Sequence, residues 1–424
     1  MAAECRKDAW SFIRVVHGIM KILLAHNFYR SSAPSGEDAA YRNERRLLER
    51  HFTIIPYERF NDDIDESTLA KRVKLALAGA WSRRTYDEVA ALIEKNRPDV
   101  AHFHNTFPLI TPSAYAACRD AGVPVVQTLH NFRLICPQAM LLRNGRPCER
   151  CLKGSFLPAL GYRCYRDSFI ATLAQVYTQN YNRCRGTYRR LVNRYISLTG
   201  FAAGKFVKAG FSPHRIAVVP NTLVDLPSAG TGGGGYALFV GRLSAEKGLG
   251  VLLEAWSGID TPLKIVGDGP LRAELEDIVR GRALGVEFTG QLGRDDVLRA
   301  VQDAMVQIVP SECYEGFPMV VLEAMACGTP VIASHIGSLG EIVLDDVTGK
   351  KFEPGNAGEL ATVVTELVKD PERLTAMRRS SRDHFDGTYA PAGHVAQLGD
   401  IYRSVIQEMK MKPSGAGMVM PPGF

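Results

Sequence analysis

The sequence has no apolar run long enough to cross a bilayer. It also has no recognisable leader, because the apolar stretch at residues 10–16 is short, contains Arg14 and lacks a small-residue cleavage site. Hydrophobic residues make up 46% of the 424 residues and charged residues 23%, which is ordinary for a globular protein. We therefore expect a protein that is not exported and that works in the reducing cytoplasm.

A strong net charge is also missing, since 51 basic and 45 acidic residues leave only +6. One short stretch without an acidic residue nevertheless holds five arginines among tyrosines and aliphatic residues: Arg183, Arg185, Arg189, Arg190 and Arg194. Two interpretations stay open, a solvated helix face and a surface attracted to an anionic membrane. The second would place the protein on the inner face of the cytoplasmic membrane. Nucleic acid is not expected as a partner, because its binding generally needs a broad basic surface.

Strand-like and helical patterns alternate along the whole chain. The first half has strand-like runs at 21–26, 52–56, 99–104 and 123–129 and helical patterns at 38–49, 67–81 and 86–95. The second half has strand-like runs at 236–240, 263–266, 286–289, 306–309 and 330–333 and a helical pattern at 249–256. Apolar β-rich runs separated by helices predict parallel sheets covered on both faces. The fold class is therefore α/β, with two tandem Rossmann-like, doubly wound domains facing a central cleft.

The length of 424 residues also favours two domains. We expect an extension at 1–19, a first domain at 20–222, a second domain at 223–390, a C-terminal helix at 391–410 returning to the first domain, and a flexible tail at 411–424. The glycine-rich stretch 228–235 marks the boundary and is predicted to be flexible, with nothing to pack against.

Three strand ends of the second half carry residues suited to a phosphate ligand. Arg242 and Lys247 lie in a loop with glycines at both ends, directly after a strand, and can hold a diphosphate. Gly267-Asp268-Gly269-Pro270 reads as a tight turn near a flat ligand, and Gly290-Gln291 ends another strand. Taken singly, solvated cations and ordinary turns would explain these residues.

A further strand end of the second half leads into a helix flanked by two glutamates, Glu315 and Glu323. Pro318 suits the first helical position and Gly328 the stop. The free backbone N–H groups of the first turn can bind an anion, and the carboxylates can accept hydrogen bonds from sugar hydroxyls. An exposed helical carboxylate and a favourable charge before a helix are the plain alternatives, but they do not explain three phosphate-suited strand ends in one domain.

Together, Glu315-x7-Glu323, Gly241-Arg242 with Glu246-Lys247-Gly248, and Gly267-Asp268-Gly269-Pro270 resemble glycosyltransferase family 4, the group 1 glycosyltransferases of GT-B fold, in a bacterial-type form. The resemblance covers residues 20–402. It implies a retaining enzyme that needs no metal for turnover, with Glu315 on the donor sugar, Glu323 on the ribose, and Arg242 and Lys247 on the diphosphate.

The resemblance also implies a wider set of site residues. Expected catalytic residues are Glu315, His130, Arg242 and Lys247, with His130 reaching the donor sugar. Further donor-binding residues are Gly36, Gly267, Asp268, Gly290, Gln291, Gly316, Phe317, Pro318, Met319, Val320 and Glu323. Acceptor contacts are expected from Asn27, Asp38, His104 and Asn105. The first domain is thus the acceptor domain and the second the donor domain.

Two aspartates and four cysteines could bind a metal and are considered separately. Asp63-Ile64-Asp65 can hold a metal in glycosyltransferases of the other common fold, but here the acids precede a predicted helix, whose start they favour. Four cysteines in a loop-like insertion at 136–164 have the spacing C-x11-C-x2-C-x12-C: Cys136, Cys148, Cys151 and Cys164. In a reducing compartment this spacing favours a structural zinc site with four cysteine ligands over free thiols, without a catalytic role.

The sequence therefore predicts a retaining glycosyltransferase that moves a sugar from a nucleotide diphosphate sugar to a glycan or lipid-linked glycan, in polysaccharide or glycoconjugate biosynthesis. One alternative is a non-catalytic GT-B protein that binds nucleotide or acts as a scaffold. Another is a GT-B nucleotide-sugar epimerase. A phosphorylase would need a pyridoxal-phosphate lysine in a matching motif, which the sequence lacks.

Overall fold

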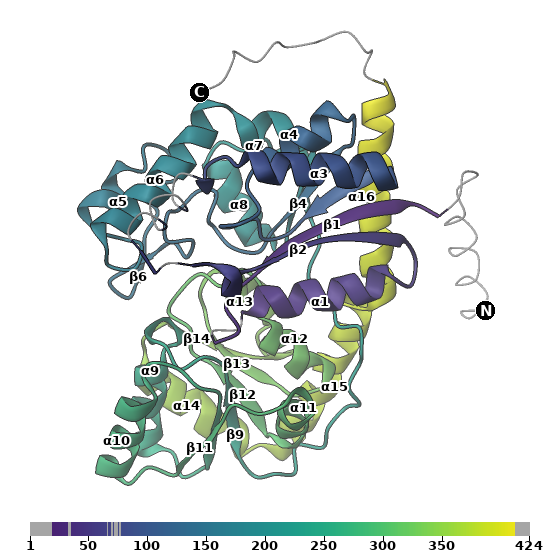
Figure 1. Ribbon diagram of the computed structural model, residues 1–424. Helices are drawn as coiled ribbons and strands as arrows, with labels where there is room; N and C mark the ends of the chain where they lie inside the picture. Colours follow the sequence, from purple (N-terminus) through teal and green to yellow (C-terminus); the bar gives the residue numbers. More distant parts are fainter. Residues whose placement is uncertain are drawn as a thin grey trace, which may run out of the picture.

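The computed structural model describes residues 19–411 except 33–34, 66, 69–70, 72–74 and 76–77. Residues 1–18 and 412–424 lie outside this part, and the helix expected over 67–81 is interrupted by these gaps. The described chain folds into two lobes, each built around a six-stranded sheet (Figure 1). This is the expected pair of doubly wound α/β domains.

The first sheet is entirely parallel, with the strand order β2-β1-β3-β4-β7-β8. Its strands are β1 (Lys21–Phe28), β2 (Thr53–Phe60), β3 (Val100–Phe103), β4 (Val125–Leu129), β7 (Arg194–Ser197) and β8 (Ile216–Val218). Its helices are α1 (Gly36–Leu48), α3 (Arg83–Asn96), α4 (Ser113–Asp120), α5 (Leu157–Gly161), α6 (Phe169–Cys184), α7 (Thr187–Leu191) and α8 (Gly200–Lys208). A short antiparallel hairpin of β5 (Leu142–Arg143) and β6 (Arg146–Pro147) lies in the cysteine-containing insertion.

The second sheet is also parallel, in the order β11-β10-β9-β12-β13-β14. Its strands are β9 (Ala237–Val240), β10 (Leu263–Val266), β11 (Val286–Gly290), β12 (Val306–Val309), β13 (Val331–Ser334) and β14 (Gly349–Phe352). Its helices are α9 (Leu249–Ala255), α10 (Arg272–Arg282), α11 (Arg294–Asp303), α12 (Met319–Ala326), α13 (Gly337–Ile342), α14 (Ala357–Val368) and α15 (Pro371–Thr388).

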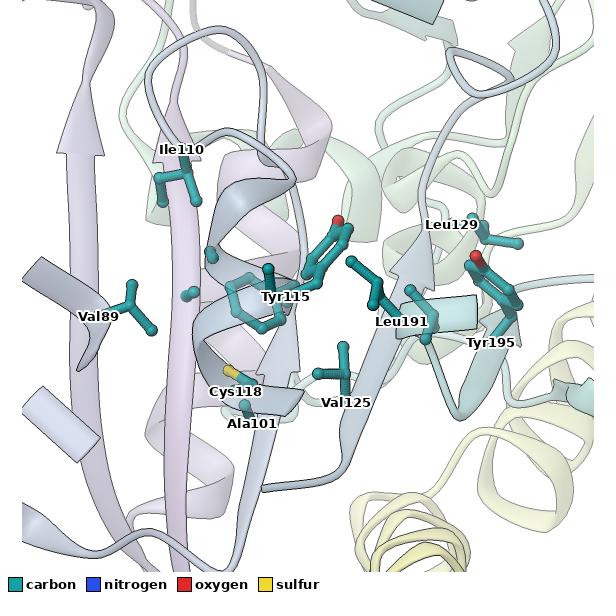
Figure 2. Packing of buried hydrophobic residues seen from close by; sticks show 14 of the residues in the cluster. Val89, Ala101, Ile110, Tyr115, Cys118, Val125, Leu129, Leu191 and Tyr195 are labelled. Carbon is teal, nitrogen blue, oxygen red and sulfur yellow. The ribbon is translucent and has the colours of Figure 1, made fainter. Parts of the chain in front are cut away.

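Burial on both faces explains why the strands are continuous apolar runs. On one face of the first sheet, Tyr115 and Cys118 of α4 pack over Ala101 of β3 and Val125 of β4 (Figure 2). On the other face lies the C-terminal helix α16 (Pro391–Met411), which runs along this lobe in yellow in Figure 1. Its Tyr402 is fully buried in the cluster that contains Ile22 and Leu24 of β1. A helix that follows the second domain in sequence thereby completes the core of the first.

The glycine-rich stretch 228–235 is not the free linker that the composition predicted. The N–H groups of Gly230, Gly232 and Gly234 donate to the carbonyls of Cys327, Gln302 and Asp303, at 2.8, 3.1 and 2.9 Å. A Cβ on Gly230 would lie 2.1 Å from the Gln302 carbonyl oxygen. The glycines therefore allow the backbone to pack directly on the second domain, and the prediction that this stretch has nothing to pack against was wrong.

The arginine-rich stretch does not form one helix face. Arg183 belongs to the last turn of α6, Arg189 and Arg190 to α7, and Arg194 begins β7. Arg194 Nη2 donates to Glu408 Oε1 of α16 at 2.5 Å, so it ties the sheet to the C-terminal helix. The interpretation as a single solvated face is therefore wrong, because a helix end and a turn redirect the side chains.

Candidate active site

The N-terminus of α12 is open toward a ligand. Pro318 is its N-cap rather than its first helical residue, and no side chain caps the first turn. Among the described residues the N–H groups of Met319 and Val320 have no intrahelical acceptor, whereas Val321 N–H donates to Pro318 O at 3.1 Å. The open start of α12 therefore carries the positive end of the helix dipole. At the other end Gly328 is left-handed (φ 69°), and its N–H donates to Met325 O at 2.9 Å, as expected for a helix stop.

Glu315 and Lys247 meet just before this helix. Lys247 Nζ lies 2.5 Å from Glu315 Oε1, and Ser311 Oγ donates to the same oxygen at 2.8 Å. Burial alone would raise the pKa of Glu315, but Lys247 and the two hydrogen bonds outweigh it and hold that pKa below its ordinary value. Burial would lower the pKa of Lys247, yet the neighbouring carboxylate raises it. The site therefore contains a partly buried carboxylate–ammonium pair at an uncapped helix N-terminus.

Glu323 lies on the second turn of α12 and has a different environment. No hydrogen bond or ion pair satisfies its carboxylate among the described residues. Burial raises its pKa from the ordinary 4.5 to about 7, opposed only in part by Arg294. The turn before α12 and the helix itself thus carry two glutamates of opposite character, the ionised and paired Glu315 and the unpaired Glu323, whose pKa is about 7.

Close backbone contacts explain two of the glycines in the second domain. Gly248 has φ 70°, and a Cβ there would lie 1.8 Å from the Pro310 carbonyl oxygen. Gly267 has φ 138°, and a Cβ there would lie 1.9 Å from the Gly241 carbonyl oxygen. The loops after β9, β10 and β12 are therefore locked together at one end of the sheet, which is where open α/β sheets bind ligands.

The other predicted donor residues lie at the ends of β9, β10 and β11. Arg242 is exposed, and no protein group in the described part of the chain hydrogen-bonds its guanidinium. Asp268 is already used, because Oδ1 accepts from Gly269 N at 2.7 Å and Oδ2 pairs with Arg272 at 3.2 Å. Gly290 ends β11, where its carbonyl accepts from Gly267 N at 2.9 Å, and Gln291 follows it exposed to solvent.

The two domains touch at His130. A Cβ on Gly316 would lie 2.1 Å from the His130 carbonyl oxygen, so the turn before α12 packs directly on the loop after β4. His130 Nε2 lies 2.8 Å from His104 Nδ1, and the two rings stack with centroids 5.0 Å apart. The structure therefore brings the backbone of His130 against Gly316, the residue that follows Glu315. Gly36, the first residue of α1, has open space around its Cα.

Three residues predicted to contact an acceptor are used inside the fold. Asp38 Oδ1 lies 2.8 Å from His26 Nε2, and Asp38 is 3% exposed. Asn27 Oδ1 accepts from Leu109 N at 2.9 Å. Asn105 Nδ2 donates to Asn27 O at 2.7 Å. These buried contacts hold the loops after β1 and β3 together, and His104 likewise lies beneath His130 rather than on the surface. The sequence showed strand ends but not which of their side chains point inward.

Glu44 is a buried residue that the sequence did not single out. It lies on α1 within reach of His102, His104 and His394. Among the described residues, Glu44, His102 and His104 form the one group of three metal-ligating side chains whose ligand atoms lie within 4.8 Å of one another. A glutamate between Asn43 and Arg45 on a helix gives no sequence signal of burial, since its partners lie up to 350 positions away.

The four insertion cysteines approach one another without forming such a group. Each of Cys136, Cys151 and Cys164 lies within electrostatic range of the other thiols of the set, and burial raises the pKa of all three, that of Cys151 to about 12. The backbone of Gln138, Ala139 and Leu141 hydrogen-bonds to Cys136. Asp65 of the Asp-x-Asp sequence accepts from Ser67 N at 2.9 Å and pairs with Lys71, so it caps the following segment.

Family models match both halves of the chain. A model of "Glycosyl transferases group 1" matches residues 230–384, and a model of "Glycosyltransferase Family 4" matches residues 68–223. The chain belongs to the group 1 glycosyltransferases of family 4. The predicted resemblance and the predicted GT-B fold are both confirmed.

Relatives of this glycosyltransferase family differ in how much of the chain they match. An uncharacterized glycosyltransferase of Methanocaldococcus jannaschii is 37% identical over 149 residues, which is 35% of this chain and 42% of that protein. The chain therefore spans less than half of that relative's length. A D-inositol 3-phosphate glycosyltransferase of Streptosporangium roseum is 26% identical over 387 residues, covering 86% of this chain and 80% of that protein.

Solved structures show the same fold. Anabaena HepE, solved in complex with UDP, has a TM-score of 0.65 at 18% identity and covers 91% of this chain and all of its own. HepE and this glycosyltransferase share the two-domain architecture. No helix in the described part of the chain combines the length and the apolar character that a membrane span requires.

Proposed function

We propose that the protein is a retaining glycosyltransferase that moves a sugar from a nucleoside-diphosphate sugar to a glycan or lipid-linked glycan. The observation that carries this proposal is the Glu315–Lys247 pair at the uncapped N-terminus of α12, with Arg242 and Glu323 unpaired beside it. The family models and the UDP-bound fold relative support a nucleotide-linked donor.

The leaving diphosphate gains charge as the sugar departs, so the site must supply positive charge there. Lys247, Arg242 and the first-turn N–H groups of α12 provide it without rearrangement. Arg242 can bind two phosphate oxygens, whereas Lys247 acts as a point charge. Glu323 accepts from the ribose hydroxyls, and Glu315 accepts from hydroxyls of the donor sugar.

Retention follows if the acceptor attacks on the face that the diphosphate leaves. The bond from the anomeric carbon to the phosphate oxygen breaks, and the bond from the acceptor oxygen to the same carbon forms. The acceptor hydroxyl proton passes to the departing phosphate oxygen, which is its nearest base. His130 and Glu315 then serve to hold the sugar from opposite domains, since Gly316 and the His130 carbonyl are in contact.

Donor binding and slow transfer to water test this proposal without knowledge of the acceptor. Calorimetry with UDP-glucose, UDP-N-acetylglucosamine, GDP-mannose and ADP-glucose should find at least one micromolar ligand. Proton NMR of its slow hydrolysis should show the first-formed sugar with the anomeric configuration of the donor. Inverted sugar would contradict retention, and failure of every donor to bind would contradict the proposed function.

Association with a membrane surface is supported better by the exposed face of α6 than by the arginine-rich stretch at 183–194. Phe169, Ile170, Leu173 and Tyr177 are 51, 72, 46 and 44% exposed and lie on one side of the helix. The exposed Arg163 and Arg166 precede it. We propose that this face binds anionic lipid, with apolar side chains inserted and arginines at the headgroups.

Replacement of two of these apolar residues should abolish membrane binding. Ile170→Glu with Leu173→Glu is expected to lower cosedimentation with phosphatidylglycerol vesicles at least tenfold, because each change puts a charge into the interface. Val347→Glu, at a 45% exposed position on the second domain, is the matched control. Equal cosedimentation of both variants would place the membrane contact elsewhere.

The insertion is proposed to hold one structural zinc ion on Cys136, Cys148, Cys151 and Cys164. Six of the nine left-handed non-glycine residues among those described lie between positions 139 and 167: Ala139, Leu141, Asn144, Arg163, Arg166 and Asp167. Each costs about 1–2 kcal/mol, so the segment needs a strong local constraint. Thiolates that accept backbone N–H groups, as Cys136 does, suit such a site.

Protein purified without chelator should contain about one zinc per chain by elemental analysis. Cys151→Ser should lose the metal and lower the melting temperature. Cys184→Ser, at an exposed cysteine outside the group, should retain it. Metal-free wild-type protein would leave the four thiols without this role.

A further inference from the structure

The buried carboxylate of Glu44 contacts three histidines that come from two distant parts of the chain. Glu44 Oε1 lies 3.1 Å from His104 Nε2 and 3.4 Å from His102 Nδ1. Glu44 Oε2 lies 3.2 Å from His394 Nε2, on the helix that returns from the second domain. Glu44 and His394 are each 6% exposed, so water does not replace these contacts.

The partners of His394 fix its protonation. Its Nδ1 lies 2.9 Å from the carbonyl oxygen of Pro220, which can only accept, so Nδ1 carries a hydrogen. Its Nε2 faces Glu44, and the hydrogen bonds that His104 and His394 donate to this carboxylate outweigh burial and hold the pKa of Glu44 well below its ordinary value. An ionised carboxylate also only accepts. His394 is therefore an imidazolium, and its charge balances that of Glu44.

With that charge balanced, His104 is neutral, because a second buried cation would have no counter-ion. Its single ring hydrogen is on Nε2, donating to Glu44. Its Nδ1 must then accept from His130 Nε2, 2.8 Å away. His102 needs no charge either, since both its nitrogens have hydroxyl partners at 2.8 Å, Tyr402 and Thr128, which can donate or accept.

The remaining nitrogen of His130 is Nδ1, which has no hydrogen-bond partner in the described part of the chain and is not among its buried unpaired atoms. Because Nε2 carries the hydrogen, Nδ1 holds a lone pair. Burial lowers the pKa of His130 well below its ordinary value, so the ring stays neutral. The exposed side of His130 is thus an acceptor.

We propose that Glu44, acting through His104, fixes His130 in the Nε2–H tautomer, so that His130 accepts a hydrogen bond from a ligand hydroxyl and does not donate one. Glu44 and His104 are positioning residues, since neither is expected to touch the ligand. The identity of that ligand as the donor sugar rests on the proposed function, whereas the tautomer does not.

Histidine NMR tests the tautomer on the full chain without any substrate. Long-range proton–nitrogen spectra of protein labelled at its ten histidines distinguish protonated from unprotonated ring nitrogens. The His130 signals, assigned by their loss in His130→Gln, should show Nε2 protonated and Nδ1 unprotonated. In Glu44→Gln they should show a mixture of tautomers. Glu58→Gln, at a carboxylate of the same domain that pairs with Arg45 instead, should leave them unchanged.

A protonated Nδ1 in the wild type would overturn the proposal, as would an unchanged spectrum in folded Glu44→Gln. The wild-type spectrum decides even where that variant fails to fold. Once a donor is known, Glu44→Gln should lower kcat/KM about tenfold, the loss expected for one hydrogen bond. It should add nothing in a His130→Ala background, because both changes remove the same contact. Absence of transfer with every donor would count against the proposed function and leave the tautomer test intact.

Discussion

Glu315→Gln is expected to lower kcat about 10²–10³-fold while the protein stays folded. Glutamine has nearly the same size, so the turn before α12 keeps its packing. The carboxylate, however, accepts from Lys247 and from Ser311 at one oxygen and leaves the second for a sugar hydroxyl. The amide removes the charge that holds Lys247 in place and weakens the bond to the sugar.

The loss should appear mainly in kcat, because the pair acts where charge develops as the diphosphate leaves. Turnover at saturating donor, measured by release of nucleotide, checks this. Glu312→Gln is the matched control, since Glu312 lies three residues earlier in the same loop and has no ion pair among the described residues. Turnover of the Glu315 variant at the wild-type level would show that Glu315 has no role in the transfer reaction.

The sheets could be predicted from the sequence because both faces of each are buried. β1 was expected at 21–26 and spans Lys21–Phe28, and seven of its eight residues are buried. The donor side could be predicted for a related reason, since its residues follow directly after strands and parallel strands end at the same edge. Glu315, Lys247 and Arg242 therefore lie near each other, although their roles stay predictions.

The rest depends on contacts that no local pattern records. Glu44 and His394 are 350 positions apart, and Arg194 and Glu408 are 214 apart. Composition also misled at Gly230, where glycine marks close packing rather than freedom. Asn27 and Asn105 follow strands as a binding residue would, but their amides tie two loops together. The orientation of a polar side chain at a strand end is decided by its neighbours in space.

Nucleotide binding is expected to release a proton through Glu323 and to weaken at acid pH. The unpaired acid of the free protein has a pKa of about 7. A ribose that donates hydrogen bonds to it favours the ionised form and lowers that pKa. By linkage, affinity rises with pH up to about 7, and between pH 7.5 and 5.5 we expect Kd for UDP to increase roughly tenfold or more.

Calorimetry in buffers of different ionisation enthalpy measures the proton directly. At pH 6 the wild type should release close to one proton more per nucleotide than Glu323→Gln, because a proton released by the terminal phosphate of UDP is common to both proteins. The variant should also bind about 10–100-fold more weakly at pH 8, as expected for a lost hydrogen bond to a charged group of about 1.5–3 kcal/mol. Glu312→Gln should keep the proton release. Undiminished release in Glu323→Gln would assign the proton to another group.

The raised pKa of Glu323 lowers the stability of the protein without nucleotide at high pH, although the ionised carboxylate favours nucleotide binding. Melting temperatures with and without nucleotide can therefore distinguish the two effects. A carboxyl group with a folded pKa above its unfolded value contributes stability that is fully present below pH 4.5 and is lost as the pH rises through 7. Without nucleotide, Glu323→Gln should therefore melt at a higher temperature than the wild type at pH 8 and at a similar one at pH 4.5. With saturating UDP at pH 8 this difference in melting temperature should shrink, because the wild type gains the stronger ribose contact. Glu323 would then destabilise the protein without nucleotide and strengthen the binding of UDP. This behaviour is expected of a binding residue and not of a structural one.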